Sequence, residues 1–408
     1  MHAFPIAPGE EYKSAIDAEC VSALSMVDFP PSSYSKKAVR RAGLALAGQL
    51  PEDPERWEEY VEVFKVAHSW RRSHAIPMRH IQQELRRLIG RTKIPGISAA
   101  RTKRMASIRR KLRSSTVSLD RMQDIGGCRA IVESMADLRV LIDRYREGTS
   151  KHSLYRYTSY LDEPRPSGYR SDHFVIEFVP PSKATESFAG RRIELQIRTQ
   201  LQHSWATAVE AIGLVRREDL KSGEGNADWL RLFQLVSAEH AEAEGTKIGD
   251  NVPPLSMRRA EIVDLEAKLQ GISTLQNLKK AFRVAEYYQT NSEYFLIQYD
   301  NVAGRVDVRG YNRMSAGDSA DALQSQERND SLNTVLVEVA KMEDLRAAYP
   351  NYFGDVTLFV KNLRNIVSRA PIDLLNVGPA KPAPKLDLSF LETWDTDRLT
   401  VHRRRRQR

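Results

Sequence analysis

The chain has 408 residues, of which 41% are hydrophobic and 28% charged, so it is long enough for two or three globular domains. No apolar run reaches the length that a membrane-spanning helix needs, and the first residues lack the pattern of a signal peptide. The two cysteines, Cys20 and Cys128, are too few for a disulfide framework or a four-cysteine zinc site. These features predict a cytoplasmic protein without a membrane partner.

The net charge of +9 predicts a polyanionic partner or substrate, and both nucleotides and RNA fit that description. The charge is unevenly spread, because residues 86–113 contain eleven Lys and Arg and no Asp or Glu. Such a block creates a strong local positive field. The alternative interpretation is a basic helix whose charged face is simply solvated.

Hydrophobic periodicity and turn residues predict an alternation of helices and strands. The first predicted helix runs from about 53 to 73, with Asp53 as its N-cap and Pro54 in its first turn. Further helices are predicted at 77–89, 135–145, 200–212 and 228–243, in two segments between 258 and 289, once between 311 and 334, and at 356–367. Strands are predicted at 128–132, 153–161, 173–178, 191–198, 294–299, 306–311 and 334–339.

This order of elements predicts an α+β fold: a mixed β-sheet flanked by helices, plus a smaller C-terminal α+β module. The predicted parts are a helical lead-in (1–53), the mixed-sheet domain (54–215), a helical connector (216–290), the C-terminal module (291–370) and a disordered basic tail (371–408). The tail is rich in proline and ends in a run of arginines, which is typical of disordered segments.

The segment 191–198 has the strict alternation of a strand with two different faces. Its apolar residues Ile193, Leu195 and Ile197 fall on one face. The other face carries Arg192, Glu194, Gln196 and Arg198, a mixture that is unusual for a solvated surface. In the helix that follows, His203, Thr207 and Glu210 share one side. One interpretation is that they face the same site; the alternative for His203 is a capping or core role, which is at least as consistent with the pattern.

Two acids, Asp124 and Glu194, are each predicted at the edge of a strand, and a magnesium ion prefers such hard oxygen ligands. Phosphates need cations, which Arg101, Lys103 and Lys111 can supply. Neither a P-loop nor a dinucleotide-binding glycine motif is present. The pair therefore points to phosphoryl chemistry, although a carboxylate of either kind, taken alone, is more often a surface or capping residue.

Five short motifs occur in an order and with gaps that resemble the synthetase domain of the RelA/SpoT family. They are RTK at 101, RRKL at 109, DIGGCR at 124, PRPSGYRSDH at 164 and IELQIRT at 193. The resemblance covers roughly residues 60–215 and implies that the domain predicted at 54–215 is a nucleotidyltransferase-like synthetase domain. No segment resembles the hydrolase domain of that family. The segment AYPNYF at 348–353 looks like the accessory region of a hydrolase-less, long single-synthetase subgroup.

The resemblance implies a role for each matching residue. Arg101, Lys103 and Lys111 would bind ATP; Asp124 and Glu194 would be catalytic and bind Mg²⁺, with Glu194 either sharing the metal or deprotonating the attacking hydroxyl. Tyr169 would stack on the base of the acceptor, and His173 would reach its phosphates. Arg165, Gln196 and Arg198 would complete the acceptor site.

The implied reaction moves the β,γ-diphosphate of ATP to the 3′-hydroxyl of GDP or GTP, giving the stringent-response nucleotides (p)ppGpp. Two alternatives remain open: a toxin that modifies the 3′ end of tRNA, and an inactive module that binds nucleotide or RNA. Ser167, Asp172 and Ala211 depart from the family pattern and leave the acceptor open. An antitoxin or a regulatory protein is a further expected partner, acting through the C-terminal module.

Overall fold

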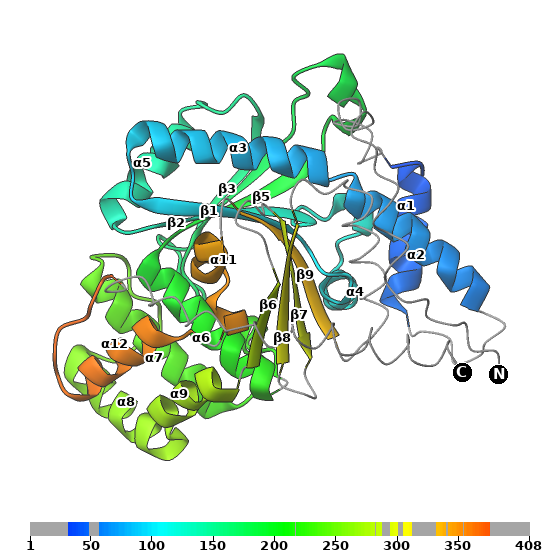
Figure 1. Ribbon diagram of the computed structural model, residues 1–408. Helices are drawn as coiled ribbons and strands as arrows, with labels where there is room; N and C mark the ends of the chain where they lie inside the picture. Colours follow the sequence, from blue (N-terminus) through cyan, green and yellow to red (C-terminus); the bar gives the residue numbers. More distant parts are fainter. Residues whose placement is uncertain are drawn as a thin grey trace, which may run out of the picture. The chain divides into compact units, whose positions relative to one another are not determined.

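The computed structural model describes residues 32–48, 57–216, 218–281, 283–287, 294–300, 305–311, 332–339, 342–353 and 355–375 (Figure 1). The chain divides into two units, Met1–Leu374 and Leu375–Arg408, and every described helix and strand lies in the first. Within the described residues, no helix is both long enough and apolar enough to span a bilayer.

The helices are α1 (Lys36–Ala47), α2 (Trp57–Arg72), α3 (Ala75–Thr92), α4 (Met105–Ser114), α5 (Met135–Arg146), α6 (Gln200–Arg216), α7 (Ala227–Ala243), α8 (Leu255–Leu269), α9 (Gly271–Ala281), α11 (Met342–Ala348) and α12 (Thr357–Val367). Short 3₁₀ turns lie at η3 (Leu119–Arg121), η4 (Lys183–Phe188), η5 (Leu220–Ser222) and η6 (Pro350–Phe353). The strands are β1 (Gly96–Thr102), β2 (Gly126–Val132), β3 (Ser153–Ser159), β4 (Asp172–Glu177), β5 (Arg192–Thr199), β6 (Arg283–Tyr287), β7 (Tyr294–Asp300), β8 (Arg305–Tyr311) and β9 (Leu332–Glu338).

The nine strands form one mixed sheet in the order β3-β4-β5-β2-β1-β9-β7-β8-β6. β2 is parallel to β5 and β6 is parallel to β8, whereas the other neighbouring strands are antiparallel. This confirms the predicted α+β fold with a helix-flanked mixed sheet. Strand β9 pairs with β1, so the strands of the predicted C-terminal module extend the same sheet. The predicted domain boundaries remain predictions.

The two faces of the sheet bury different helices, as the alternation in β5 predicts. Ile193, Leu195 and Ile197 are fully buried in a cluster that includes α3 and α5. The opposite face is covered by α6, α7 and α12, whose apolar residues form a second cluster (Figure 1). The polar side chains of β5 therefore point into the layer between the sheet and α6. They are not exposed to solvent as the side chains of a solvated strand face would be.

A third apolar cluster anchors α4, the helix with the basic motif RRKL. Met105, Ile108 and Leu112 on its apolar stripe are buried against α1 and α2, where they meet Val39 and Trp70 among other residues. The stripe is the one that helical spacing predicts. Its burial fixes the rotation of α4 and so the direction of Lys111, which lies on a neighbouring face of the helix.

Two strands are missing from the sequence-based prediction. Residues 96–102 are predicted as a loop and the start of a basic segment, but the small apolar residues there form β1 between β2 and β9. Residues 283–287 are predicted as helical but form β6, which pairs with β8. In both cases, pairing with strands distant in sequence overrides a weak local signal. The predicted cap at Asp53 and Pro54, most of the lead-in, the helix between 311 and 334, and the tail from 376 lie outside the described residues.

One buried histidine in α7 makes the stability of the fold depend on pH. His240 is fully buried, and neither of its ring nitrogens has a hydrogen-bond partner in the part of the chain that the structure describes. Burial and then Arg170 lower its pKa well below the usual 6.5. Below about pH 6.5, His240 is protonated in the unfolded chain but stays neutral in the folded chain. The free energy of unfolding therefore decreases as the pH falls below this value.

His240→Leu is therefore expected to increase the free energy of unfolding by roughly 1–3 kcal/mol near pH 6, because a buried polar group without partners is replaced by an apolar one. Below about pH 6.5, the free energy of unfolding of this variant should also fall less steeply with decreasing pH, by about 1.4 kcal/mol per pH unit. Urea denaturation at several pH values between about 5 and 7 measures both effects. His240→Gln keeps an unsatisfied polar group and should show no gain in stability. If the free energy of unfolding of His240→Leu depends on pH as it does in the parent protein, His240 is not a cause of that dependence.

Candidate active site

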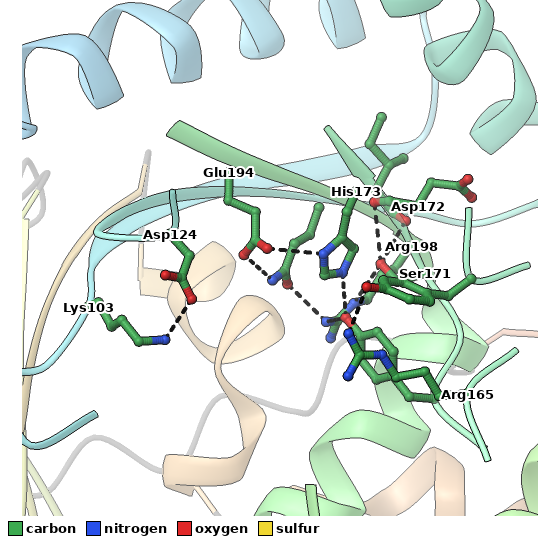
Figure 2. Close-up of polar contacts among 12 residues, drawn as sticks. Lys103, Asp124, Arg165, Ser171, Asp172, His173, Glu194 and Arg198 are labelled. Carbon is green, nitrogen blue, oxygen red and sulfur yellow. Dashed lines mark hydrogen bonds and ion pairs between the residues drawn. The ribbon is translucent and has the colours of Figure 1, made fainter. Parts of the chain in front are cut away.

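Asp124 and Glu194 lie on the same face of the sheet (Figure 2). Asp124 stands just before β2, and the parallel pairing of β2 with β5 sets Gly126 opposite Ile193 and Gly127 opposite Glu194. Gly126 permits this close approach, because a Cβ at that position would lie 2.6 Å from Cδ1 of Ile193. The glycine pair after Asp124 therefore brings the two acids together although they are distant in sequence.

Two lysines hold the Asp124 carboxylate. Its Oδ2 atom lies 2.8 Å from Nζ of Lys103 and 2.8 Å from Nζ of Lys111. Burial alone would raise the pKa of Asp124, but the two lysines outweigh it and lower the pKa below the usual value. The carboxylate is therefore ionised at neutral pH. Lys103 and Lys111, both predicted to bind ATP, are brought to the acid that is predicted to bind the metal.

A divalent cation fits beside these acids. The Oδ1 atom of Asp124 is buried and has no hydrogen-bond partner among the described residues. A buried carboxylate oxygen without a partner is costly, and a cation would satisfy it. Magnesium typically takes one or two carboxylates and completes its shell with substrate phosphates and water. Asp124 and Glu194 match that donor set, although no cluster of three or more metal-binding side chains occurs within the described ranges.

Glu194 belongs to a continuous chain of hydrogen bonds (Figure 2). His173 Nδ1 lies 3.0 Å from Glu194 Oε1, and His173 Nε2 lies 2.7 Å from the Tyr169 hydroxyl. Arg198 donates to that hydroxyl and, at 2.9 Å, to Oε1 of Gln196. Gln196 in turn donates to Oε2 of Glu194 at 2.7 Å, which closes the ring. Five of the predicted site residues are thus joined in one network.

The network keeps Glu194 ionised and brings Tyr169 close to its titration range. Burial would raise the pKa of Glu194, but the hydrogen bonds from His173 and Gln196 and the charge of Lys103 lower it far below its usual value. Burial would likewise raise the pKa of Tyr169, yet Arg198, His173 and Lys221 together lower it to about 7. These groups are coupled and titrate as a set.

The Tyr169 ring is buried, which differs from the predicted open stacking surface. Only 7% of the residue is exposed, and Tyr160, His173 and Trp205 all contact its ring edge-on. Gly168 has a φ of 88°, and a Cβ there would lie 2.9 Å from Cβ of Ser237, so the turn is pressed against α7. This packing directs the ring inward. Stacking on a base requires the ring or its neighbours to move.

Arg165 and Asp172 lie apart from the network. Arg165 is exposed, with its guanidinium 4.6 Å above the Tyr160 ring and 2.7 Å from the Tyr160 hydroxyl. Asp172 is fully buried and accepts a hydrogen bond from the Tyr157 hydroxyl at 2.6 Å. Its side chain points to the other face of β4 from His173, since neighbouring residues of a strand alternate. This departure from the family pattern therefore adds no acid to the acceptor side.

Arg101, predicted to bind ATP, is covered by a segment near the C-terminus. Its guanidinium lies 5.6 Å from the centre of the Tyr349 ring, and it also hydrogen-bonds Tyr352. Arg129 lies 5.4 Å from the same ring and donates to the carbonyl oxygen of Ala348 at 2.9 Å. Sequence reasoning missed Arg129 as a site residue. An arginine in an otherwise small and apolar strand was the available signal.

The helix after β5 contributes two of its predicted side chains to this region. Nε2 of His203 lies 3.1 Å from the carbonyl oxygen of Ala347. Glu210 is paired with Lys221 at 2.7 Å. Burial would raise the pKa of Glu210, but Lys221, Arg129 and Arg101 outweigh it and lower the pKa. Glu210 therefore lies among the cations that line the polar face, as its spacing on α6 predicts.

The family described as "Region found in RelA / SpoT proteins" matches residues 100–213, the segment that carries both acids and the network around Glu194. This chain therefore carries a RelA/SpoT domain. The match confirms the family that the five motifs indicate. It ends before α7 and the strands β6–β9.

Curated relatives of this RelA/SpoT domain include the GTP pyrophosphokinase of Escherichia coli K12, which is 27% identical over 209 residues, covering 48% of this chain and 25% of the relative. The GTP pyrophosphokinase rsh of Brucella melitensis biotype 1 is 29% identical over 128 residues, covering 30% and 15%. This chain thus matches a quarter or less of the length of these relatives.

Solved structures similar to the chain include small alarmone synthetase 1 of Bacillus subtilis bound to its product pppGpp. It is 23% identical, has a TM-score of 0.36, and the match covers 46% of this chain and 92% of that one. A GTP pyrophosphokinase family protein of Streptococcus pneumoniae is 20% identical with a TM-score of 0.35, and the match covers 53% and 97%.

Proposed function

We propose that the RelA/SpoT domain is a pyrophosphotransferase that moves the β,γ-diphosphate of ATP to the 3′-hydroxyl of GDP or GTP. The observation that carries this proposal is the pair Asp124 and Glu194 on one sheet face, with an unpaired Asp124 oxygen and two lysines beside it. The curated relatives are named GTP pyrophosphokinases, which supports the same chemistry.

In this proposal Asp124 and Glu194 would hold Mg²⁺, which would supply neutralisation of the charge on the diphosphate. Lys103 and Lys111, which pair with Asp124 in the structure, are proposed to bind the ATP phosphates. The 3′-oxygen of the acceptor forms a bond to the β-phosphorus, and the bond between that phosphorus and the oxygen bridging to the α-phosphate breaks. AMP leaves with the electron pair of that bond.

The pKa of Glu194 favours the role of metal ligand over that of sole base. A general base works best when its pKa lies near the working pH, whereas the pKa of Glu194 is lowered far below it. His173, whose pKa is raised by Tyr169 and Glu194 despite its burial, contacts Glu194 directly. The 3′-hydroxyl proton is proposed to pass to the Glu194–His173 pair, while Gln196 and Arg198 position Glu194.

The acceptor side of the site is proposed to comprise Arg165, Tyr169 and His173. Tyr169 stacks on the acceptor base after its ring has left the position between Tyr160 and Trp205. Base stacking on an aromatic ring is typically worth about 1–3 kcal/mol, which is comparable with the edge-on contacts that the ring gives up. Arg165, exposed at the mouth of this turn, is available to the acceptor.

Transfer to tRNA would use the same site residues as transfer to GDP or GTP. It would also need a continuous basic surface that binds the rest of the RNA. The basic block 86–113 does not form one such surface. The exposed arginines of α3 belong to a helix packed on the face of the sheet opposite α6, whereas Lys103 and Lys111 lie at the site. This separation favours a free nucleotide as the acceptor.

Transfer of label from γ-labelled ATP tests the proposal, with GDP, GTP and bulk tRNA offered separately in the presence of Mg²⁺. The expected result is a labelled guanosine nucleotide and no label on tRNA. Label on tRNA alone would replace the nucleotide acceptor with RNA. No transfer to any of the three acceptors would contradict the proposed activity and leave an inactive binding module.

A further inference from the structure

The loop that follows α6, residues 218–223, is tied to both sides of the site. On one side, Asp219 pairs with Arg110 of α4 at 3.0 Å. On the other side, Lys221 pairs with Glu210 of α6 at 2.7 Å. The buried side chain of Leu220 and a backbone hydrogen bond from Glu218 to Gly213 anchor the loop between these ion pairs. The loop lies outside the segment that matches the RelA/SpoT family.

The polar face that this loop borders has an excess of positive charge. The cations are Arg101, Lys103, Lys111, Arg129, Arg198 and Lys221, and the carboxylates are Asp124, Glu194 and Glu210. Among the residues that the structure describes, these six cations therefore face three carboxylates. Partly buried charges of one sign are costly unless a ligand of opposite charge compensates them. The excess favours a ligand that brings several negative charges.

Lys221 is the lysine of this set most open to solvent. Its side chain is 42% exposed, compared with 37% for Lys111 and 23% for Lys103. It is paired with Glu210 of α6, the helix whose Trp205 contacts the Tyr169 ring, and its charge also acts on the Tyr169 hydroxyl. Glu210 does not depend on Lys221 alone, since Arg129 and Arg101 also stabilise its charge. Lys221 can therefore move away from Glu210 while Arg129 and Arg101 continue to compensate the Glu210 carboxylate.

We propose that Lys221 binds a phosphate of the acceptor nucleotide, as a binding residue supplied by the loop after α6. This inference rests on the proposed transfer function and adds a residue to it. The flexible stem of a lysine lets Nζ exchange the Glu210 carboxylate for a phosphate oxygen nearby. The loop needs no rearrangement for this exchange, because Leu220 and the Asp219–Arg110 pair keep its backbone in place.

Lys221→Gln is expected to raise the KM for GDP about 10- to 100-fold, the usual effect of losing one hydrogen bond to a charged group. The KM for ATP should change less than about twofold. Lys221→Arg, which keeps the charge, should remain within a few-fold of the parent protein. Lys268→Gln removes another exposed lysine of an ion pair, that with Asp228, and serves as the matched control.

Arg110→Gln tests whether the position of the loop, and not the charge of Lys221, determines GDP binding. This substitution breaks the ion pair between Arg110 and Asp219 and leaves Lys221 unchanged. It should leave the KM for GDP nearly unchanged. An effect of Arg110→Gln as large as that of Lys221→Gln would overturn the proposal and make loop closure the cause. The proposal would also be overturned by a KM for GDP unaltered in Lys221→Gln, or by equal losses in the Gln and Arg variants.

Equilibrium dialysis with GDP separates this inference from the proposed reaction. If the parent protein transfers no label to any acceptor, the proposed function fails while GDP binding is still measurable. Weaker GDP binding by Lys221→Gln than by the parent would then support Lys221 as a phosphate-binding residue. Equal binding by the two proteins, or no GDP binding by either, would contradict it.

Discussion

Glu194→Gln and Asp124→Asn are each expected to lower the rate of diphosphate transfer by about 10²–10⁴-fold. Each substitution removes one negative charge and one oxygen donor from the proposed magnesium site and keeps the shape of the side chain. Asp124→Asn also leaves Lys103 and Lys111 without their shared partner. The measurement is initial-rate transfer from labelled ATP at saturating magnesium, together with the melting temperature of each variant.

Matched controls lie on elements next to those that carry the two acids. Glu177 lies near the end of β4 and pairs with Arg192, and Asp120 in η3 pairs with Arg40. Glu177→Gln and Asp120→Asn remove the same charges from ion pairs that do not involve Asp124, Glu194 or the network around Glu194, and should keep transfer within about twofold. Transfer that survives in Glu194→Gln or Asp124→Asn, or that is lost equally in the controls, would contradict the proposed roles of the two acids.

Tyr349→Ala is expected to lower the KM for ATP about tenfold. The ring of Tyr349 contacts both Arg101 and Arg129, and a cation–π contact is typically worth about 0.5–2 kcal/mol. Removing the ring releases both guanidinium groups for phosphates, and a gain of about 1.4 kcal/mol corresponds to a factor of ten. If Arg101 has its proposed role in binding ATP, the segment from α11 to η6 competes with the donor nucleotide. Steady-state kinetics with varied ATP measures the effect.

Tyr349→Ala is also expected to destabilise the protein, because only 3% of Tyr349 is exposed. Replacing a buried aromatic residue with alanine typically destabilises a protein by about 3–5 kcal/mol, so the kinetics should be recorded well below the melting temperature. Tyr349→Phe keeps the ring over both arginines and should have the KM of the parent protein. A folded Tyr349→Ala variant with an unchanged KM for ATP would rule out competition by this segment.

The features that the sequence predicts correctly are those with a local cause. The alternation of Ile193, Leu195 and Ile197 with polar neighbours determines both the strand and the two faces that it presents. The stripe Met105, Ile108 and Leu112 determines how α4 packs and therefore where Lys111 points. Local patterns of this kind fix which side chains share a face before any tertiary contact is known.

The features that the sequence does not reveal depend on distant partners. β1 is stabilised by pairing with β2 on one side and β9 on the other, and the composition of residues 96–102 does not show it. The burial of Tyr169 results from the packing of Gly168 against α7, more than sixty residues further along the chain. The stacking of Tyr349 on Arg101 likewise joins two segments that local periodicity cannot relate.

The fate of adenine-labelled ATP tests the central claim, that the two acids serve diphosphate transfer, most directly. The protein is incubated with this ATP, Mg²⁺ and unlabelled GDP, and the adenine nucleotides are separated with time. The account predicts labelled AMP in an amount equal to the modified guanosine nucleotide, and neither product in Asp124→Asn. Labelled ADP in place of AMP, or AMP formed equally without an acceptor, would contradict diphosphate transfer.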